Sequence, residues 1–170
     1  MNKFNELNPD QFDQSPFRVV GKEWMLITAG TPDKINTMTA SWGGLGVMWA
    51  KNVSFVGIRP QRYTKEFVDN TDTFSLSFFD SSFKKQLGYL GTVSGRDEDK
   101  IGKSGLTVRY TEDNIPFFDE AKTVIICKKL YAQDYKPECF IDKELDSMYY
   151  PDADYHTLYI SEVQKILIRE

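Results

Sequence analysis

Two short stretches, each at the end of a predicted strand, carry the residues best suited to chemistry. Residues 36–42 read Asn-Thr-Met-Thr-Ala-Ser-Trp, and residues 58–64 read Ile-Arg-Pro-Gln-Arg-Tyr-Thr. Hydroxyls, backbone donors and fixed positive charge suit a phosphate, and the aromatic and apolar side chains suit a flat group attached to it. A strand that only packs against a core does not need such a cluster of hydroxyls and positive charge. The two stretches therefore predict a site for a phosphate ester that carries a flat, partly apolar group.

In the second stretch, two arginines flank a turn that leads into a predicted helix. Arg59 and Arg62 lie on either side of Pro60, and Thr64 is expected to open a helix that ends near residue 70. An arginine fork forms charge-assisted bonds with phosphate, and the free N–H groups at a helix start favour an anion. The alternative is a solvated Arg62 and a Thr64 that only caps the helix.

In the first stretch, strand alternation places three hydroxyls on one face. Thr37, Thr39 and Ser41 share this face, and because an unpaired buried hydroxyl costs about 1–3 kcal/mol, each needs a partner or solvent. A solvated face is the simple alternative. Against it, the strand runs directly into residues 42–44, Trp-Gly-Gly, which we interpret as a shaped turn rather than an exposed edge.

Two further segments carry candidate site residues. Residues 94–100, Ser-Gly-Arg-Asp-Glu-Asp-Lys, form a charged run that by itself indicates a solvated face. The run also offers the Ser94 hydroxyl, a close backbone N–H at Gly95 and another cation at Lys100. The lone histidine, His156, precedes the last predicted strand. A single histidine is more often structural than catalytic, but proton chemistry at neutral pH makes it a candidate.

Metal and disulfide chemistry are poorly supported. Two cysteines, Cys127 and Cys139, and one histidine are too few for a disulfide framework or a zinc site. The cysteines also lack the Cys-x-x-Cys spacing that tunes thiol redox potentials. The glycines of residues 43–46 do not complete a dinucleotide fingerprint, and no Walker lysine follows a glycine loop.

The composition indicates one ordinary globular domain, residues 1–170, with 41% hydrophobic and 14% aromatic residues. The formal net charge of −4 and the lack of a basic stripe argue against nucleic acid and anionic membranes as partners. We see no signal-peptide pattern and no apolar run of membrane-spanning length, so we expect a cytoplasmic protein.

Strand signals dominate the chain. Strands are predicted at residues 24–29, 35–42, 53–58, 73–79, 106–110, 123–131 and 157–168. Short helices are predicted after Thr64 and after residue 81 or 82, the second ending at Gly91. Six or seven strands with two or three short helices predict a closed antiparallel barrel and disfavour a doubly wound parallel sheet.

The order and spacing of four motifs resemble the flavin reductase-like family of FMN-binding split barrels, and within it the flavoredoxin branch. The motifs are residues 36–42, 58–64, 94–100 and 156–159, the last reading His-Thr-Leu-Tyr. Any one of them is weak, whereas four in order are specific, and the likeness runs from about residue 22 to residue 163. One departure is Ser161, where a glycine commonly precedes Glu-Val in the family.

The resemblance implies a mainly β fold, a Greek-key split β-barrel with a few short helices, which dimerises and holds FMN in a groove at the dimer interface. Residues 38–42 would contact the flavin ring edge and ribityl chain, and residues 62–64 would hold the phosphate. The predicted cofactor-binding residues are Met38, Thr39, Ala40, Ser41, Trp42, Arg59, Arg62, Tyr63, Thr64, Ser94, Gly95 and Lys100. His156 is the candidate catalytic residue, near the flavin or the incoming nicotinamide, and no metal ligand is expected.

The implied function is an FMN-dependent oxidoreductase that passes electrons from NADH or NADPH through bound FMN to an unidentified acceptor. The flavin would do the redox chemistry, so no side-chain nucleophile or metal is required. Two alternatives stay open. One is a flavoredoxin-type carrier that moves electrons between proteins, with a redox partner protein in place of a small substrate. The other is a non-catalytic flavin-binding protein.

Overall fold

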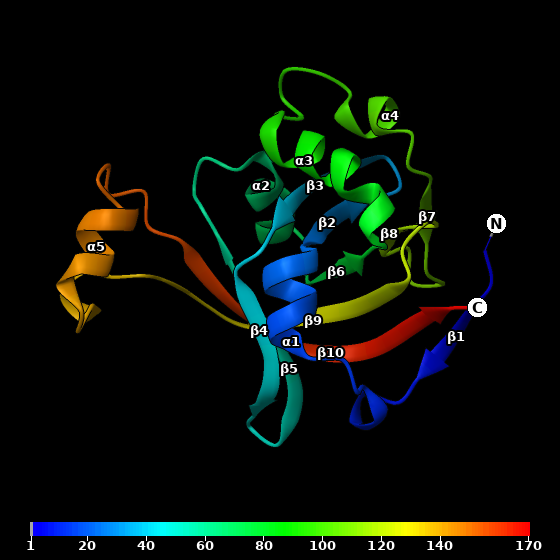
Figure 1. Ribbon diagram of the computed structural model, residues 1–170, viewed down its shortest axis with the longest axis horizontal. Coiled ribbons are helices and arrows are strands. Elements are labelled where there is room, and N and C mark those ends of the chain that lie inside the picture. The colour runs from blue at the N-terminus through cyan, green and yellow to red at the C-terminus, as the bar shows by residue number, and fades with distance from the viewer. Residues whose placement is uncertain (1) are drawn as a thin grey trace.

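The computed structural model describes residues 2–170, and the predicted mainly β fold class is confirmed (Figure 1). The strands are β1 (Phe4–Leu7), β2 (Met25–Thr31), β3 (Lys34–Ala40), β4 (Gly43–Met48), β5 (Lys51–Ile58), β6 (Thr73–Phe78), β7 (Val108–Tyr110), β8 (Pro116–Phe118), β9 (Thr123–Asp134) and β10 (Thr157–Arg169). Eight of them form one antiparallel sheet in the order β3-β2-β6-β9-β10-β5-β4, with β1 paired to the C-terminal part of β10. The short strands β7 and β8 pair with each other.

The α-helices are short. They are α1 (Pro16–Arg18), α2 (Tyr63–Asp69), α3 (Lys84–Thr92), α4 (Lys100–Ser104) and α5 (Lys143–Tyr149). Helices α2 and α3 pack near β3, and α4 lies beside α3. In contrast, α5 is carried away from the sheet on an arm, residues 135–156, that connects β9 to β10 (Figure 1).

The connection between β3 and β4 explains why the sheet curls. These two strands lie at opposite ends of the strand order, yet only Ser41 and Trp42 separate them in the chain. Because so short a connection spans at most about 11 Å, the two edges of the sheet must approach each other here. The sheet therefore closes into a barrel that is split along this line, and we call residues 41–42 the seam.

Strand β4 corrects the prediction of a shaped turn at residues 42–44. Gly43 already begins a strand that pairs with β5 and forms an edge of the sheet. At a φ of +153°, a Cβ on Gly43 would lie 2.3 Å from the carbonyl oxygen of Phe55, so only glycine allows this approach. Because glycines weaken a strand signal, β4 escaped the sequence pattern. The short strands β1 and β8 were missed as well.

The apolar residues form two buried clusters that share β2. Met25 and Ile27 pack inside the barrel with Phe74, Leu76 and Phe78, whose alternation along β6 was predicted from the sequence. On the other face of β2, Leu26 joins a second cluster beneath α3. Burial on both faces explains why β2 is continuously apolar instead of alternating. Within residues 2–170, no helix combines the length and the apolar composition needed to cross a bilayer.

Ser161 lies at a register shift of β10 and is fully buried. Within the described residues, its hydroxyl is one of the buried polar groups that lack a hydrogen-bond partner. Its cross-strand neighbour Ser54 differs, since the Ser54 hydroxyl donates to the sulfur of Cys127 at 3.3 Å. The two serines thus occupy paired positions in the core but only one is satisfied.

We expect Ser161→Ala to raise the free energy of unfolding by about 1 kcal/mol, because the substitution removes a buried hydroxyl that has no partner. Urea denaturation monitored by tryptophan fluorescence measures the change. Ser54→Ala is the matched control and should bring no gain, because it removes a hydroxyl that is bonded. An alanine at position 161 that lowers stability would contradict this reading of the core.

Candidate functional site

The candidate site consists of two adjoining cavities, one at the seam and one beside it. The seam pocket, about 210 Å³, is lined by Met38, Thr39, Ala40, Ser41, Trp42, Gly57, Arg59, Arg62 and His156. The cation pocket, about 180 Å³, is lined by Met38, Gln61, Arg62, Tyr63, Thr64, Thr92, Val93, Ser94 and Lys100. Met38 and Arg62 line both, so the two cavities adjoin, and we call them together the groove.

The structure brings together eleven of the twelve residues predicted to bind the cofactor. Seven line the seam pocket and four more line the cation pocket. Gly95 is the exception, since it lines neither cavity. A Cβ there would lie 2.3 Å from the amide oxygen of Asn36 and 3.3 Å from the ring of Tyr63. Gly95 therefore allows its loop to pack closely behind the site.

The cation pocket holds two positive charges that have no carboxylate partner. Arg62 donates to the carbonyl of Gly91 at 2.8 Å, and Lys100 donates to the carbonyls of Leu90 and Val93 at 3.0 Å each. Within residues 2–170, neither side chain forms an ion pair. Both cations are therefore held only by neutral carbonyls at the end of α3.

Burial makes these two charges costly. Lys100 is 3% exposed, and burial together with the charge of Arg62 lowers the pKa of its ammonium to about 8. Burial also lowers the pKa of the Arg62 guanidinium. Because like charges in a partly desolvated cavity disfavour each other, an anion placed between them would relieve both effects.

The start of α2 supplies further hydrogen-bond donors to the cation pocket. The helix begins at Tyr63 with Arg62 as its N-cap residue, so the expectation that Thr64 opens or caps it is wrong. The Thr64 hydroxyl accepts a bond from the side-chain amide of Asn36 at 3.0 Å. Within residues 2–170 its own proton has no acceptor, so it can donate into the cavity that Thr64 lines.

The threonine hydroxyls of β3 form hydrogen bonds to the neighbouring elements β2 and α3. Thr37 donates to the carbonyl of Ile27 at 3.1 Å and lies 2.9 Å from the hydroxyl of Thr28. Thr39 donates to the carbonyl of Leu87 in α3 at 2.5 Å. The partners of Thr37 and Thr39 are therefore within the protein, so these two hydroxyls are not solvated, whereas Ser41 lines the seam pocket. Thr39 still lines the seam pocket, but its hydroxyl bonds to α3.

The opposite end of the groove is aromatic. The ring of His156 lies 5.0 Å from the ring of Trp42, and Nδ1 of His156 lies 2.8 Å from the hydroxyl of Tyr150. Burial, with a smaller effect from the charge of Arg59, lowers the pKa of His156 to about 4. The imidazole is therefore neutral at neutral pH. Burial thus disfavours proton exchange by His156 near neutral pH, and its role at the site stays a prediction.

Arg59 lines the seam pocket but its charge is already neutralised. It forms an ion pair with Asp154, donates to the carbonyl of Tyr149 at 2.8 Å and stacks over the ring of Tyr150 at 5.1 Å. Arg59 therefore fastens the arm that carries α5 to the edge of the groove. Arg59 and Asp154 are 95 residues apart in the sequence, so no local pattern could predict their contact.

Four lining residues were missed by the sequence reasoning, namely Gly57, Gln61, Thr92 and Val93. Gly57 had a usable signal, because an isolated glycine in a strand often marks a close approach. A Cβ at Gly57 would lie 3.3 Å from Cδ2 of His156, so glycine lets the imidazole rest on β5.

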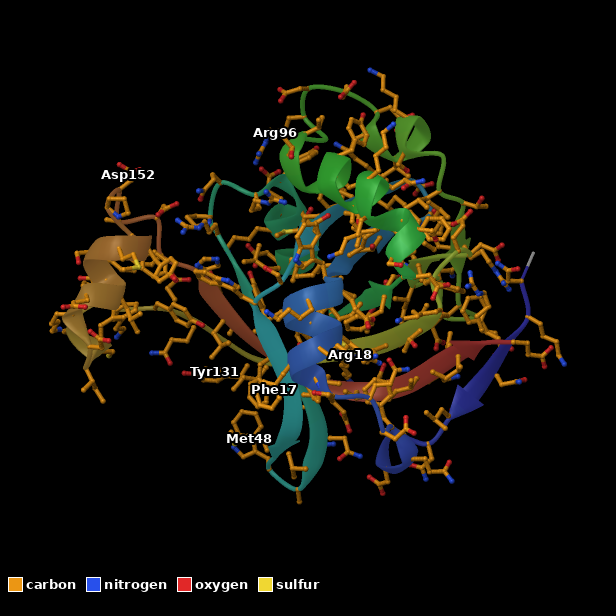
Figure 2. The ribbon with its side chains drawn as sticks, viewed as in Figure 1. Phe17, Arg18, Met48, Arg96, Tyr131 and Asp152 are labelled. Carbon is orange, nitrogen blue, oxygen red and sulfur yellow. The ribbon has the colours of Figure 1, made fainter. Side chains whose placement is uncertain are left out.

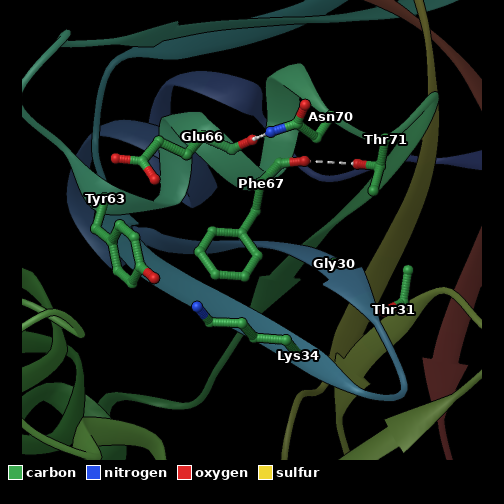
Figure 3. A pocket seen from close by; sticks show the side chains of 8 residues that line it. All are labelled: Gly30, Thr31, Lys34, Tyr63, Glu66, Phe67, Asn70 and Thr71. Atoms are coloured by element: carbon green, nitrogen blue, oxygen red, sulfur yellow. Dashed lines mark hydrogen bonds between the residues drawn. The ribbon is translucent and has the colours of Figure 1, made fainter.

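A separate cavity of about 280 Å³ lies between α2 and the turn that joins β2 to β3 (Figure 3). Its aromatic wall is formed by Tyr63 and Phe67, and the ammonium of Lys34 lies 5.7 Å and 5.8 Å from these two rings. Tyr63 is shared with the cation pocket. None of its other lining residues was predicted to belong to the site.

Residues 17–170 match the family model described as flavin reductase like domain, and the chain belongs to this family. The predicted resemblance is thereby confirmed. Among curated proteins, no sequence matches the chain.

Solved structures with the same fold confirm the split-barrel class. A flavoredoxin from Methanosarcina acetivorans shares 23% identity, with a TM-score of 0.66 over 85% of this chain and 67% of that one. An FMN-binding domain of a flavin reductase-like enzyme from Shewanella baltica shares 17% identity, with a TM-score of 0.71 over 98% of this chain and 78% of that one. An NADH:FAD oxidoreductase of Streptomyces globisporus shares 15% identity, with a TM-score of 0.64 over 87% of this chain and 77% of that one. At these identities the likeness concerns the fold alone.

Proposed function

We propose that residues 1–170 act as a single FMN-binding domain, an oxidoreductase whose flavin takes electrons from NADH or NADPH and passes them to an acceptor. The observation that carries the proposal is a pair of cations, the half-buried Arg62 and the buried Lys100, which have no carboxylate partner in the described chain. The phosphate of FMN supplies the anion that this pair lacks.

The two cavities divide the cofactor between them. Arg62, Lys100 and the free proton of Thr64 would hold the phosphate in the cation pocket. Met38, which lines both cavities, would lie beside the ribityl chain. The flat ring would occupy the seam pocket against Trp42, where the charge of Arg59 is already paired.

FMN is our choice over FAD for reasons of charge. Solved relatives include proteins named for FMN binding and one named as an NADH:FAD oxidoreductase. A terminal phosphate monoester carries both of its charges on one group, as phosphates do near neutral pH. Two neighbouring cations in a single cavity of about 180 Å³ match such a group.

When bound, FMN would supply the redox chemistry, accepting a hydride and releasing electrons. The chain itself would bind and orient the flavin and limit access of water to it. The carrier alternative is favoured by one finding, namely that the solved relatives include flavoredoxins. The exposed rings of Trp42 and Tyr149 beside the seam pocket would suit either a nicotinamide or a protein surface.

Arg62→Ala should weaken FMN binding by about 2–3 kcal/mol, the scale of a lost charge-assisted contact. The affinity of this variant for riboflavin, which lacks the phosphate, should hardly change. Quenching of flavin fluorescence in equilibrium titrations measures both affinities. Arg109→Ala is the control, because Arg109 pairs with Asp119 and lines neither cavity of the groove. An equal loss for both ligands would contradict the phosphate assignment.

Anaerobic mixing of the FMN-loaded protein with NADH or NADPH should bleach the flavin within the time of a catalytic turnover. Stopped-flow absorbance at the flavin band measures the rate, and free FMN under the same conditions is the control. Bleaching only by a reduced partner protein would support the carrier instead. A flavin that stays oxidised with every donor would indicate a non-catalytic flavin-binding protein.

We further propose that the chain acts as a homodimer through an apolar patch at the edge strand β4. Figure 2 shows Phe17, Met48 and Tyr131 around this edge, and Phe17 and Trp49 are 89% and 57% exposed. Trp49 also contacts Tyr131, with ring centroids 6.3 Å apart. An open edge with exposed apolar side chains favours association with a second copy.

Sedimentation should show a dimer at micromolar concentration. Val47 lies on β4 beside Met48 and is 69% exposed, so Val47→Asp should place a charge in the patch and convert the dimer to monomers. We propose further that FMN lies at the dimer interface, as the family resemblance implies, so the monomer should also lose FMN. Tyr110→Asp, at an exposed tyrosine on β7, is the control. A wild-type monomer that retains FMN at high dilution would refute the interface.

A further inference from the structure

The hydrogen bond between Tyr150 and His156 has a direction that its surroundings determine. Nδ1 of His156 lies 2.8 Å from the Tyr150 hydroxyl, and the two side chains are 7% and 6% exposed. Within residues 2–170, that hydroxyl has no other hydrogen-bond partner. If it accepted a proton from Nδ1, its own buried proton would be left unpaired, which is unfavourable. Tyr150 therefore donates, and Nδ1 accepts.

The direction of this bond sets the tautomer of the imidazole. A neutral imidazole with an accepting Nδ1 carries its proton on Nε2. Within the described residues, Nε2 has no hydrogen-bond partner. It is also not among the polar atoms that are both fully enclosed and unpaired, so it is not sealed off from solvent. Since His156 lines the seam pocket, this nitrogen is accessible there. Its proton is free to bond a ligand.

The groups around the pair keep both partners neutral. Arg59 stacks over the Tyr150 ring at 5.1 Å and lowers the pKa of His156, whereas Asp154, the ion-pair partner of Arg59, acts in the opposite direction. Burial has the largest effect and lowers the pKa of His156 to about 4. Burial likewise raises the pKa of Tyr150, as does the nearby Tyr135.

We propose that Tyr150 is a positioning residue that fixes His156 as an Nε2–H donor at the seam pocket. Such a donor recognises a ligand with a hydrogen-bond acceptor at its edge, such as a carbonyl oxygen or ring nitrogen of a flavin. This use of the donor rests on the proposed function, whereas the tautomer itself does not. Because the imidazole is neutral, it forms a bond to the ligand without transferring a proton.

The tautomer can be read directly, because His156 is the sole histidine of the sequence. Two-bond proton–nitrogen NMR spectra of the full chain, labelled with ¹⁵N-histidine and free of flavin, should show a protonated Nε2 and an unprotonated Nδ1. The pattern should not change between about pH 6 and pH 8. A protonated Nδ1, or an imidazolium in that range, would overturn the proposal.

A pair of matched variants tests the part played by Tyr150. Tyr150→Phe removes the donor, so the signals of Nδ1 and Nε2 should move toward each other as both tautomers become populated. Tyr155→Phe is the control, since its ring stacks on Tyr150 at 4.9 Å and its hydroxyl donates to Asp146 at 2.8 Å. This variant should keep the wild-type pattern. An unchanged tautomer in Tyr150→Phe would also overturn the proposal.

Titration with FMN separates this inference from the proposed function. In the wild-type protein, bound FMN should shift the Nε2 signal and its proton, and the shift should be smaller in Tyr150→Phe. Bound FMN that leaves Nε2 unchanged would overturn the ligand contact. Failure of FMN to bind at all would count against the proposed function, and the spectra of the flavin-free protein would still decide the tautomer.

Discussion

Two like charges, one buried at Lys100 and one half-buried at Arg62, are the constraint on which the site depends. Arg62 enters from the turn after β5 and Lys100 from the start of α4, and both are held by carbonyls at the end of α3. Holding them together has a cost, which the lowered pKa of Lys100 reflects. Because no carboxylate of residues 2–170 pairs with either cation, the proposed phosphate would supply the counter-charge.

The curl of the sheet places a flat, largely uncharged cavity next to that anion site. The seam joins the two edges of the sheet through Ser41 and Trp42, and the end of β3 therefore faces the residues that follow β5. Arg59 neutralises Asp154 at the rim, and His156 is uncharged. One end of the groove thus suits a phosphate and the other a planar ring, an arrangement that follows from the strand order.

The sequence was most informative where the pattern was local. The alternation of Phe74, Leu76 and Phe78 predicted the inner face of β6, and short motifs predicted eleven residues of the groove. It failed where partners are distant, as for the Thr39 hydroxyl and the carbonyl of Leu87, 48 residues apart. The neutral state of His156 was equally inaccessible, because it arises from burial and from Arg59. β4 was missed because its glycines allow close approach but give no strand signal.

The central claim is that a phosphate sits against Lys100, and proton uptake on binding tests it most directly. With a pKa of about 8, Lys100 is largely unprotonated in the free protein at a pH half a unit or more above that value. A bound phosphate should raise this pKa, so calorimetric titration with FMN in buffers of different ionisation enthalpy should show a proton taken up, and Lys100→Met should abolish the uptake. Binding without proton uptake, or equal uptake in Lys100→Met, would contradict the account.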